Sequence, residues 1–531
     1  MSFMVEKEAN NAKNDVMPSS RIQHLSHRGI AIRLFFTCWI VFVLHFATNV
    51  VREIYPALSL GDHMSFDVTE YVGLHPDIFE IPGRGAYINN NPGASILGAV
   101  PYSLTRPLIA FVVERIQNQR AKSPAFNARE YKTIHTNSIK FYRMAVERGL
   151  DVKLALAAGV IQAFCMAPLS ALAVVVMFYI LLAMTRSLRL AILLSLLFAF
   201  ATPVFYRTAF LNHNILLAHF SLFSFALLWR PWADSDKTRS FPYLAAGLLC
   251  GWTIVLDYSG IVAIFSISIY AILRYFFLPK ESRSIQHLML FFVGIAICGS
   301  VLMAYQWFSF GHPFYPAQYY MPHTEFSQEG YHGMTLPKLH LLFETAFSRR
   351  YGLFTSAPIL LLVFCMPFFR RNIVERIGGK QLLFILIYVC GFFLFCASNQ
   401  FGYVQFNTGV RHIVPVTPFL FLIVAVVIIQ MPKVPAVLFS VISLYWSWCL
   451  VMYRDVEFGL GIPESFIHIT FGGFQLPWLS TLNRMGYFQN QPTVLPIFLI
   501  CGAVIWVIWA IKDPFRRVGR EELLAKNNEN Q

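Results

Sequence analysis

The chain has 531 residues, of which 56% are hydrophobic and only 13% are charged. A soluble domain is about one-quarter charged, so this composition excludes an ordinary soluble protein. The formal net charge is +14, and in a membrane protein an excess of Lys and Arg is typical of cytoplasmic loops rather than of nucleic-acid binding. The nine cysteines lie inside apolar runs without metal-ligand spacing, so no disulfide framework and no cysteine metal site is predicted.

The N-terminal residues 1–30 are polar, and we predict a disordered cytoplasmic segment there. Apolar runs of membrane-spanning length then recur along the chain and predict an all-α polytopic membrane protein with about twelve transmembrane helices. The expected spans are residues 31–51, 152–183, 189–204, 214–230, 242–257, 259–278, 288–308, 353–370, 381–398, 412–430, 434–453 and 492–511. They form one transmembrane domain over residues 31–511, followed by a cytoplasmic tail at 512–531.

The charges of the short connections predict the orientation. Segments such as "TRSLR", "PKESR" and "RRNIVERIGGK" alternate with connections poor in Lys and Arg, such as "DYSG". Since Lys and Arg mark cytoplasmic loops, both termini are expected in the cytoplasm of a multi-pass protein of the plasma (inner) membrane.

Three segments on the opposite, extracytoplasmic side are long: residues 52–151, 309–352 and 453–492. The first contains a moderately apolar stretch, Ser95 to Glu114, which carries Arg106 and two prolines. A spanning helix would bury this arginine and reverse every later span, so we interpret the stretch as an interfacial or re-entrant helix.

Polar residues collect in the extracytoplasmic segments. The first of these segments supplies the carboxylates Glu53, Asp62, Asp67, Glu70, Asp77 and Glu80, interleaved with Pro, Gly and aromatic residues. Carboxylates in a folded loop are candidates for general bases, although each one by itself is more often a solvated loop residue. Basic candidates on the other segments are Arg207, Lys338, Arg349, Arg350 and Arg411; an arginine binds phosphate, or anchors a loop at the lipid headgroups.

Motifs for other chemistries are missing from the sequence. The histidines show no ligand spacing such as HExxH, so no metal site is predicted from spacing, and a divalent metal ion is left open as a cofactor. The chain has no P-loop, no GxGxxG and no nucleophile elbow, which argues against a nucleotide-driven machine.

The layout resembles the GT-C class of integral-membrane glycosyltransferases, and is similar to the bacterial protein mannosyltransferase and aminoarabinose transferase groups (family 39-like). The resemblance rests on four segments in chain order: "DIFEIPGRGAYINNNPGASILGAVPY", "ATPVFYRTAFLNHN", "YGLFTSAPILLL" and "NTGVRHIVPVTPF". Two features depart from the family pattern. The tight Asp-Glu pair after the first helix is absent, and Asn91 replaces the usual lysine before Pro-Gly.

The resemblance implies a hexosyl or pentosyl transferase that moves a sugar from a polyprenyl-phosphate carrier to a hydroxyl of a glycan, lipid or protein acceptor. Asp77 is then the expected base, with Asp67 and Asp62 as further candidates. Arg207 and Arg411 are expected to bind the phosphate, and Lys338 is a weaker candidate. Glu70, Asn89 and Asn91 are substrate-binding candidates, although the asparagines also suit a turn.

Two other functions stay open. A transporter or flippase of a lipid-linked sugar would need ionisable residues inside the membrane, and the predicted spans contain few. A glycan polymerase or ligase would use the same carriers, and the length of its product would separate it from an enzyme that transfers single sugars.

Overall fold

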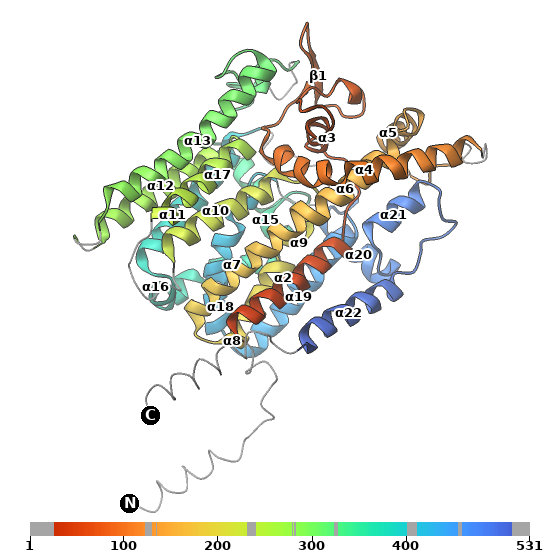
Figure 1. Cartoon of the computed structure of the whole chain (residues 1–531). Helices are drawn as coiled ribbons and strands as arrows, with labels where there is room; N and C mark the ends of the chain where they lie inside the picture. Colours follow the sequence, from red (N-terminus) through yellow and green to blue (C-terminus); the bar gives the residue numbers. More distant parts are fainter. Residues whose placement is uncertain are drawn as a thin grey trace, which may run out of the picture.

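The computed structural model describes residues 26–122, 130–133, 135–230, 240–278, 280, 283–322, 328–400, 411–454 and 459–511. Most of these residues are helical, and the helices pack into a single bundle (Figure 1). The expectations for residues 1–25 and for the tail at 512–531 lie outside the described residues.

Apolar helices make up the bundle. They are α2 (His27–Leu44), α6 (Asp151–Ile161) continued by the π-helical turn η4 (Gln162–Met166) and α7 (Ala167–Thr185), α8 (Leu188–Phe200), α10 (His213–Trp229), α11 (Ser240–Leu256), α12 (Gly260–Phe277), α13 (Ile285–Phe310), α17 (Gly379–Ser398), α18 (Thr417–Gln430), α19 (Lys433–Met452) and α22 (Leu495–Ala510).

The predicted fold class is confirmed. Seven helices in the described part of the chain are long and apolar enough to cross a membrane, and five shorter apolar helices accompany them. Each predicted span coincides with an apolar helix, except that residues 353–370 form the short α15 (Leu353–Ser356) and the 3-10 helix η8 (Pro358–Phe369). The last turns of this segment contain Pro367, which has no N–H for an α-helical hydrogen bond.

The first long loop is folded rather than irregular. It contains α3 (Ile54–His63), the turn η2 (Thr69–Tyr71), a hairpin of β1 (Ile78–Ile81) and β2 (Gly85–Ile88), then α4 (Gly93–Ala121) and α5 (Thr136–Glu147). The strands pair antiparallel, with Ile78 opposite Ile88. Gly83 and Gly85 have positive φ angles in the connecting turn, a conformation that costs glycine nothing.

The helix α4 is longer than the apolar stretch expected there. It continues without a break through Pro101 and Pro107 and is one of the seven helices of membrane-spanning length and composition. It packs on α3 and α6, and in Figure 1 it lies along the upper edge of the bundle. Arg106 on this helix donates a hydrogen bond to the carbonyl of Gly61 in α3. The interfacial placement of this helix stays a prediction.

The other long segments also carry short helices. The segment 309–352 contains the turn η6 (Ala317–Tyr319) and α14 (Leu339–Phe347), whereas α16 (Arg370–Ile377) lies in the short connection between η8 and α17. Between α19 and α22 lie α20 (Ile462–Gly472) and α21 (Pro477–Arg484). A five-residue helix, α9 (Pro203–Arg207), and the turn η9 (Val414–Val416) precede α10 and α18.

The described chain begins and ends at one end of the bundle. Arg33 in the second turn of α2 donates a hydrogen bond of 2.7 Å to the carbonyl of Ile511, which follows α22. The helix α2 then runs to the other end, where α3 and the hairpin lie (Figure 1). Residues that follow α2 are therefore separated from both described chain ends by the length of the bundle.

Glycines bring α11 and α13 into close contact. A Cβ atom on Gly247 of α11 would lie 2.0 Å from the carbonyl oxygen of Phe291, and one on Gly251 would lie 2.8 Å from the Cβ of Cys298. Gly294 of α13 faces α11 in the same way, since a Cβ atom on it would lie 2.6 Å from the amide nitrogen of Leu248. Small residues spaced by four let helix backbones approach in a membrane, where dispersion and weak polar contacts replace the hydrophobic effect.

We expect Gly247→Ala to lower the melting temperature of the protein in detergent, because the backbone of Phe291 cannot move without separating the two helices. Overpacking of this kind costs about 1–3 kcal/mol. Gly299→Ala is the matched control, since a Cβ on Gly299 meets no atom within 4 Å. Equal melting temperatures for the two variants would show that the contact does not hold the helices together.

Candidate active site

Side chains from five separate segments meet at the end of the bundle where α2 ends. This polar cluster consists of Arg52, Glu53, Asp77, His213, Asp257, Arg411 and His412. Arg52 and Glu53 follow α2, and Asp77 precedes β1. His213 begins α10, Asp257 lies between α11 and α12, and Arg411 and His412 precede α18. The bundle topology therefore assembles the cluster from positions up to 360 residues apart.

Local turns fix two of these positions, and a longer-range hydrogen bond ties the first loop to them. The side chain of Asn212 accepts hydrogen bonds from the amides of Asn214 and Ile215, so that α10 begins at His213. The carboxylate of Asp257 accepts a hydrogen bond of 2.8 Å from the amide of Ser259, which holds it at the end of α11. The amide of Asn91 donates to the carbonyl of Ile254 at 2.7 Å and ties the first loop to the same helix end.

Glu53 is the innermost carboxylate of the cluster. Its side chain is 5% exposed and accepts a hydrogen bond from Nδ1 of His213 at 2.5 Å. Burial by itself would raise the pKa of Glu53, but the hydrogen bond from His213 and the charge of Arg52 lower it to about 2. Glu53 is therefore ionised at neutral pH, and it holds the imidazole of His213 in one orientation.

Asp77 lies at the open side of the cluster. Its carboxylate accepts a hydrogen bond of 3.1 Å from Arg52 and remains 34% exposed. Burial of Arg52 disfavours its charge, but Glu53, Asp77 and Asp257 together raise the pKa of Arg52 above its ordinary value. The cluster thus combines an accessible carboxylate with a guanidinium that stays charged.

Two further arginines, Arg207 and Arg454, extend the positive charge of Arg411 beyond the polar cluster. Arg207, at the end of α9, is fully buried, and burial with the nearby charge of Arg411 lowers its pKa to about 10. Burial, followed by the charge of Arg52, lowers the pKa of Arg411 to about 10. Arg454 donates to the carbonyl of Tyr206, and burial together with Arg207 lowers its pKa to about 9. Such a concentration of positive charge favours an anion.

Of the predicted catalytic carboxylates, Asp77 alone belongs to the polar cluster. Asp67 accepts hydrogen bonds from the amides of Thr69 and Ala86, and so joins η2 to the hairpin. Asp62 accepts a hydrogen bond from the hydroxyl of Tyr102 and pairs with Lys153 at 3.0 Å.

The predicted substrate-binding residues lie in several places. Arg411 belongs to the polar cluster and Arg207 lies beside it. Glu70 pairs with Lys153 in the first loop, and Lys338 pairs with Glu329 in the segment before α14. Asn91 donates a hydrogen bond to the carbonyl of Ile254 in α11. The side-chain oxygen of Asn89 is buried with no hydrogen-bond partner in the described part of the chain.

Besides Arg52, four residues of the polar cluster were not among the predicted catalytic or substrate-binding residues: Glu53, named only among the loop carboxylates, and His213, Asp257 and His412. The sequence contained one signal for them, because each lies within a few residues of the outer end of a predicted span. Their pairing leaves no spacing signal, since the closest two along the chain, His213 and Asp257, are 44 positions apart.

Among the residues that the structure describes, two groups of side chains have ligand atoms close enough to hold a metal ion. The first is His213, Asp257 and His412 in the polar cluster, and the second is Asp62, His63 and Glu70 in the first loop; in each group the ligand atoms lie within 4.8 Å of one another. The second group is more exposed, and two of its three members already pair with Lys153.

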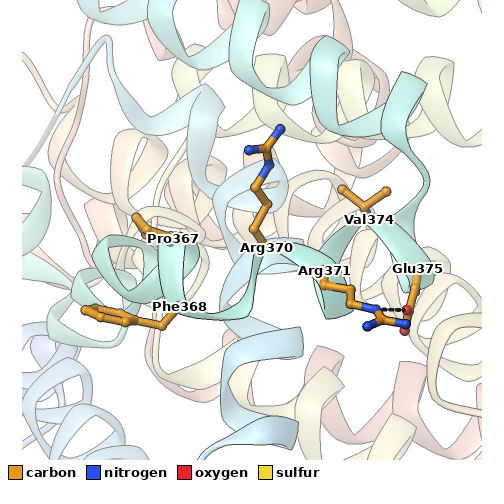
Figure 2. Close-up of a pocket in the computed structure, with 6 residues that line it drawn as sticks. All are labelled: Pro367, Phe368, Arg370, Arg371, Val374 and Glu375. Carbon is orange, nitrogen blue, oxygen red and sulfur yellow. Dashed lines mark hydrogen bonds and ion pairs between the residues drawn. The ribbon is translucent and has the colours of Figure 1, made fainter.

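One surface pocket lies elsewhere. It is lined by residues at the junction of η8 and α16, among them Pro367, Phe368, Arg371 and Glu375, with Arg371 and Glu375 paired to each other (Figure 2). Arg376 in α16 donates to the carbonyl of Met184 at the C-terminal end of α7. This pocket therefore contains no residue of the polar cluster, and the candidate site rests on the cluster itself.

Comparison with known proteins supports one family. Residues 146–317 match the model of the dolichyl-phosphate-mannose-protein mannosyltransferases. No curated protein and no solved structure gives a significant match. The matched residues include His213 and Asp257 of the polar cluster and the neighbouring Arg207. The other members of the cluster lie outside the matched residues. The resemblance found in the sequence motifs is thereby confirmed, and this multi-pass membrane protein is similar to the GT-C-type glycosyltransferases.

Proposed function

We propose that the protein is a membrane glycosyltransferase that moves one sugar from a polyprenyl-phosphate carrier to an acceptor hydroxyl at the extracytoplasmic face of the plasma (inner) membrane. The family match supports the reaction class. The observation that carries the proposal is the polar cluster, in which an accessible carboxylate lies next to charged arginines at one end of an apolar bundle. The charge pattern of the connecting segments supports the orientation.

Asp77 is the base in this proposal. Its carboxylate takes the proton from the acceptor hydroxyl while the hydroxyl oxygen attacks the anomeric carbon, and the bond from that carbon to the phosphate oxygen breaks. Asp77 is the most exposed carboxylate among those that form ion pairs in the cluster, whereas Glu53 is buried. Asp67 and Asp62 remain alternatives.

The arginines receive the leaving group. The departing lipid phosphate gains negative charge as the bond breaks, and guanidinium groups placed beforehand stabilise that charge without reorganisation. Arg411 and Arg207 are our phosphate ligands, and Arg454 extends the same positive region. Asn89, with its buried unpartnered oxygen, is our candidate for a sugar hydroxyl.

The direct test uses membranes from a host that expresses the chain and from the same host without it. Each is supplied with a panel of radiolabelled polyprenyl-phosphate hexoses and pentoses. We expect label to move to a product that gains a single sugar, in the expressing membranes alone. Label that crosses the bilayer without covalent transfer would favour the flippase, and a product that gains many sugar units would favour the polymerase or ligase.

A further inference from the structure

The imidazoles of His213, at the start of α10, and of His412, in the turn before η9, approach the carboxylate of Asp257 from two different segments. Nε2 of His213 lies 3.5 Å from Oδ2 of Asp257, and Nδ1 of His412 lies 3.6 Å from Oδ1. Both histidine side chains are more than nine-tenths buried, and Asp257 is 18% exposed. Three ligating atoms thus converge on one small region next to the open side of the cluster.

The hydrogen bond from His213 to Glu53 determines where the proton of this imidazole lies. An ionised carboxylate only accepts, so Nδ1 of His213 carries the proton and donates it to Glu53. Nε2 is then the ring nitrogen that faces away from Glu53. It is buried, has no hydrogen-bond partner among the described residues, and is directed at the carboxylate of Asp257. A buried ring nitrogen without a hydrogen-bond partner needs an explanation, and a cation between this nitrogen and the carboxylate would supply one.

His412 completes the arrangement. The amide nitrogen of Asn214 approaches its Nδ1 at 3.4 Å. The same Nδ1 lies 3.6 Å from Oδ1 of Asp257, so His412 faces the carboxylate that Nε2 of His213 also faces. Two imidazole nitrogens and one carboxylate therefore face a common point, with their ligand atoms within 4.8 Å of one another.

We propose that His213, Asp257 and His412 bind one divalent transition-metal ion, of which zinc is the best match, and that Glu53 orients His213 from behind. Two imidazoles and a carboxylate are typical of zinc sites that keep one position open, whereas calcium and magnesium prefer oxygen ligands alone. A carboxylate that accepts the second N–H of a ligating histidine is the usual outer partner in such sites. The inference rests on these contacts and does not require glycosyl transfer.

The second group of side chains provides an internal contrast. Asp62 and Glu70 share Lys153 as an ion-pair partner, at 3.0 and 3.2 Å, so a cation there would have to displace an ammonium group. His63 is exposed. We therefore assign no metal to that group, and His63→Gln serves as the matched control.

The experiment uses the full-length protein, purified without a histidine tag and treated with a chelator. Zinc chloride is added, excess is removed by gel filtration, and bound metal is measured by mass spectrometry. We expect one equivalent per chain in the wild type and in His63→Gln. His412→Gln should lose the metal, and Glu53→Gln should weaken binding by about 10- to 100-fold. No bound equivalent in the wild type, or full binding by His412→Gln, would overturn the proposal.

A second variant separates ligation from a packing role of the imidazole. His412→Cys offers a thiolate, which zinc and cobalt(II) bind well. With cobalt(II), this variant should show a sulfur-to-metal charge-transfer band that the wild type lacks. Absence of the band in a variant with a normal gel-filtration profile would exclude residue 412 as a ligand. Neither readout uses a sugar donor, so failure here and failure of the proposed transfer are distinguishable.

Discussion

Sugar transfer is expected to fall by about 10²–10⁴-fold in Asp77→Asn, the range that a positioned general base contributes. The amide keeps the size of the side chain but cannot take the proton of the acceptor hydroxyl. The ion pair with Arg52 is lost as well, although Arg52 keeps Glu53 as a partner. Initial rates with a labelled polyprenyl-phosphate sugar, normalised to the amount of protein in the membrane, measure the effect.

The control for this variant is Glu80→Gln. Glu80 is an exposed carboxylate on β1 of the same hairpin, so its loss removes one charge from the same loop without touching the polar cluster. Activity should stay close to that of the wild type. Transfer that survives in Asp77→Asn and disappears in Asp67→Asn or Asp62→Asn would move the base to one of those residues.

The second large effect is expected for Arg207→Lys. Lysine keeps the positive charge but lacks the planar fork that binds two phosphate oxygens at once. Hydrogen bonds to charged groups contribute about 1.5–3 kcal/mol, and we therefore expect transfer to fall by about one to two orders of magnitude. Because Arg207 is fully buried at the end of α9, the shorter reach of lysine cannot be compensated by a shift of the backbone.

Kinetics as a function of donor concentration identify the step that is lost. A rise in KM with constant kcat would indicate phosphate binding in the ground state, and a fall in kcat would indicate stabilisation of the leaving group. Arg115→Lys, an exposed arginine on α4, is the control. Wild-type kinetics in Arg207→Lys would contradict a role of this residue in phosphate binding.

The bundle could be predicted from the sequence because its signal is local. An apolar run such as residues 434–453 must form a helix if it is to lie in lipid, since every backbone N–H and C=O then finds its partner within the segment. For that reason most predicted spans agree with the helices to within a few residues, although the first, 31–51, extends seven residues beyond the end of α2 at Leu44. The agreement is poorest at residues 353–370, where prolines divide one run into α15 and η8.

In the first loop, the sequence does not distinguish the carboxylate of the polar cluster from those with other contacts. Its carboxylates look alike in the sequence, and nothing in their spacing separates Asp67, which joins η2 to β2, from Asp77, which faces Arg52. The hairpin of β1 and β2 was not predicted either. Its strands have four residues each, too short for a clear alternation of polar and apolar residues.

The sequence by itself determined that this is an all-α polytopic membrane protein, and its motifs determined the resemblance to GT-C-type glycosyltransferases. Only the tertiary structure decided which polar residues share a site. Glu53 and His213 are 160 positions apart, and His412 follows Asp257 by 155 positions, so their contacts depend on which helix ends lie side by side. Helix formation in lipid is dictated by hydrogen bonds within each segment, whereas the choice of neighbours depends on packing between segments, such as the glycine contacts of α11 with α13.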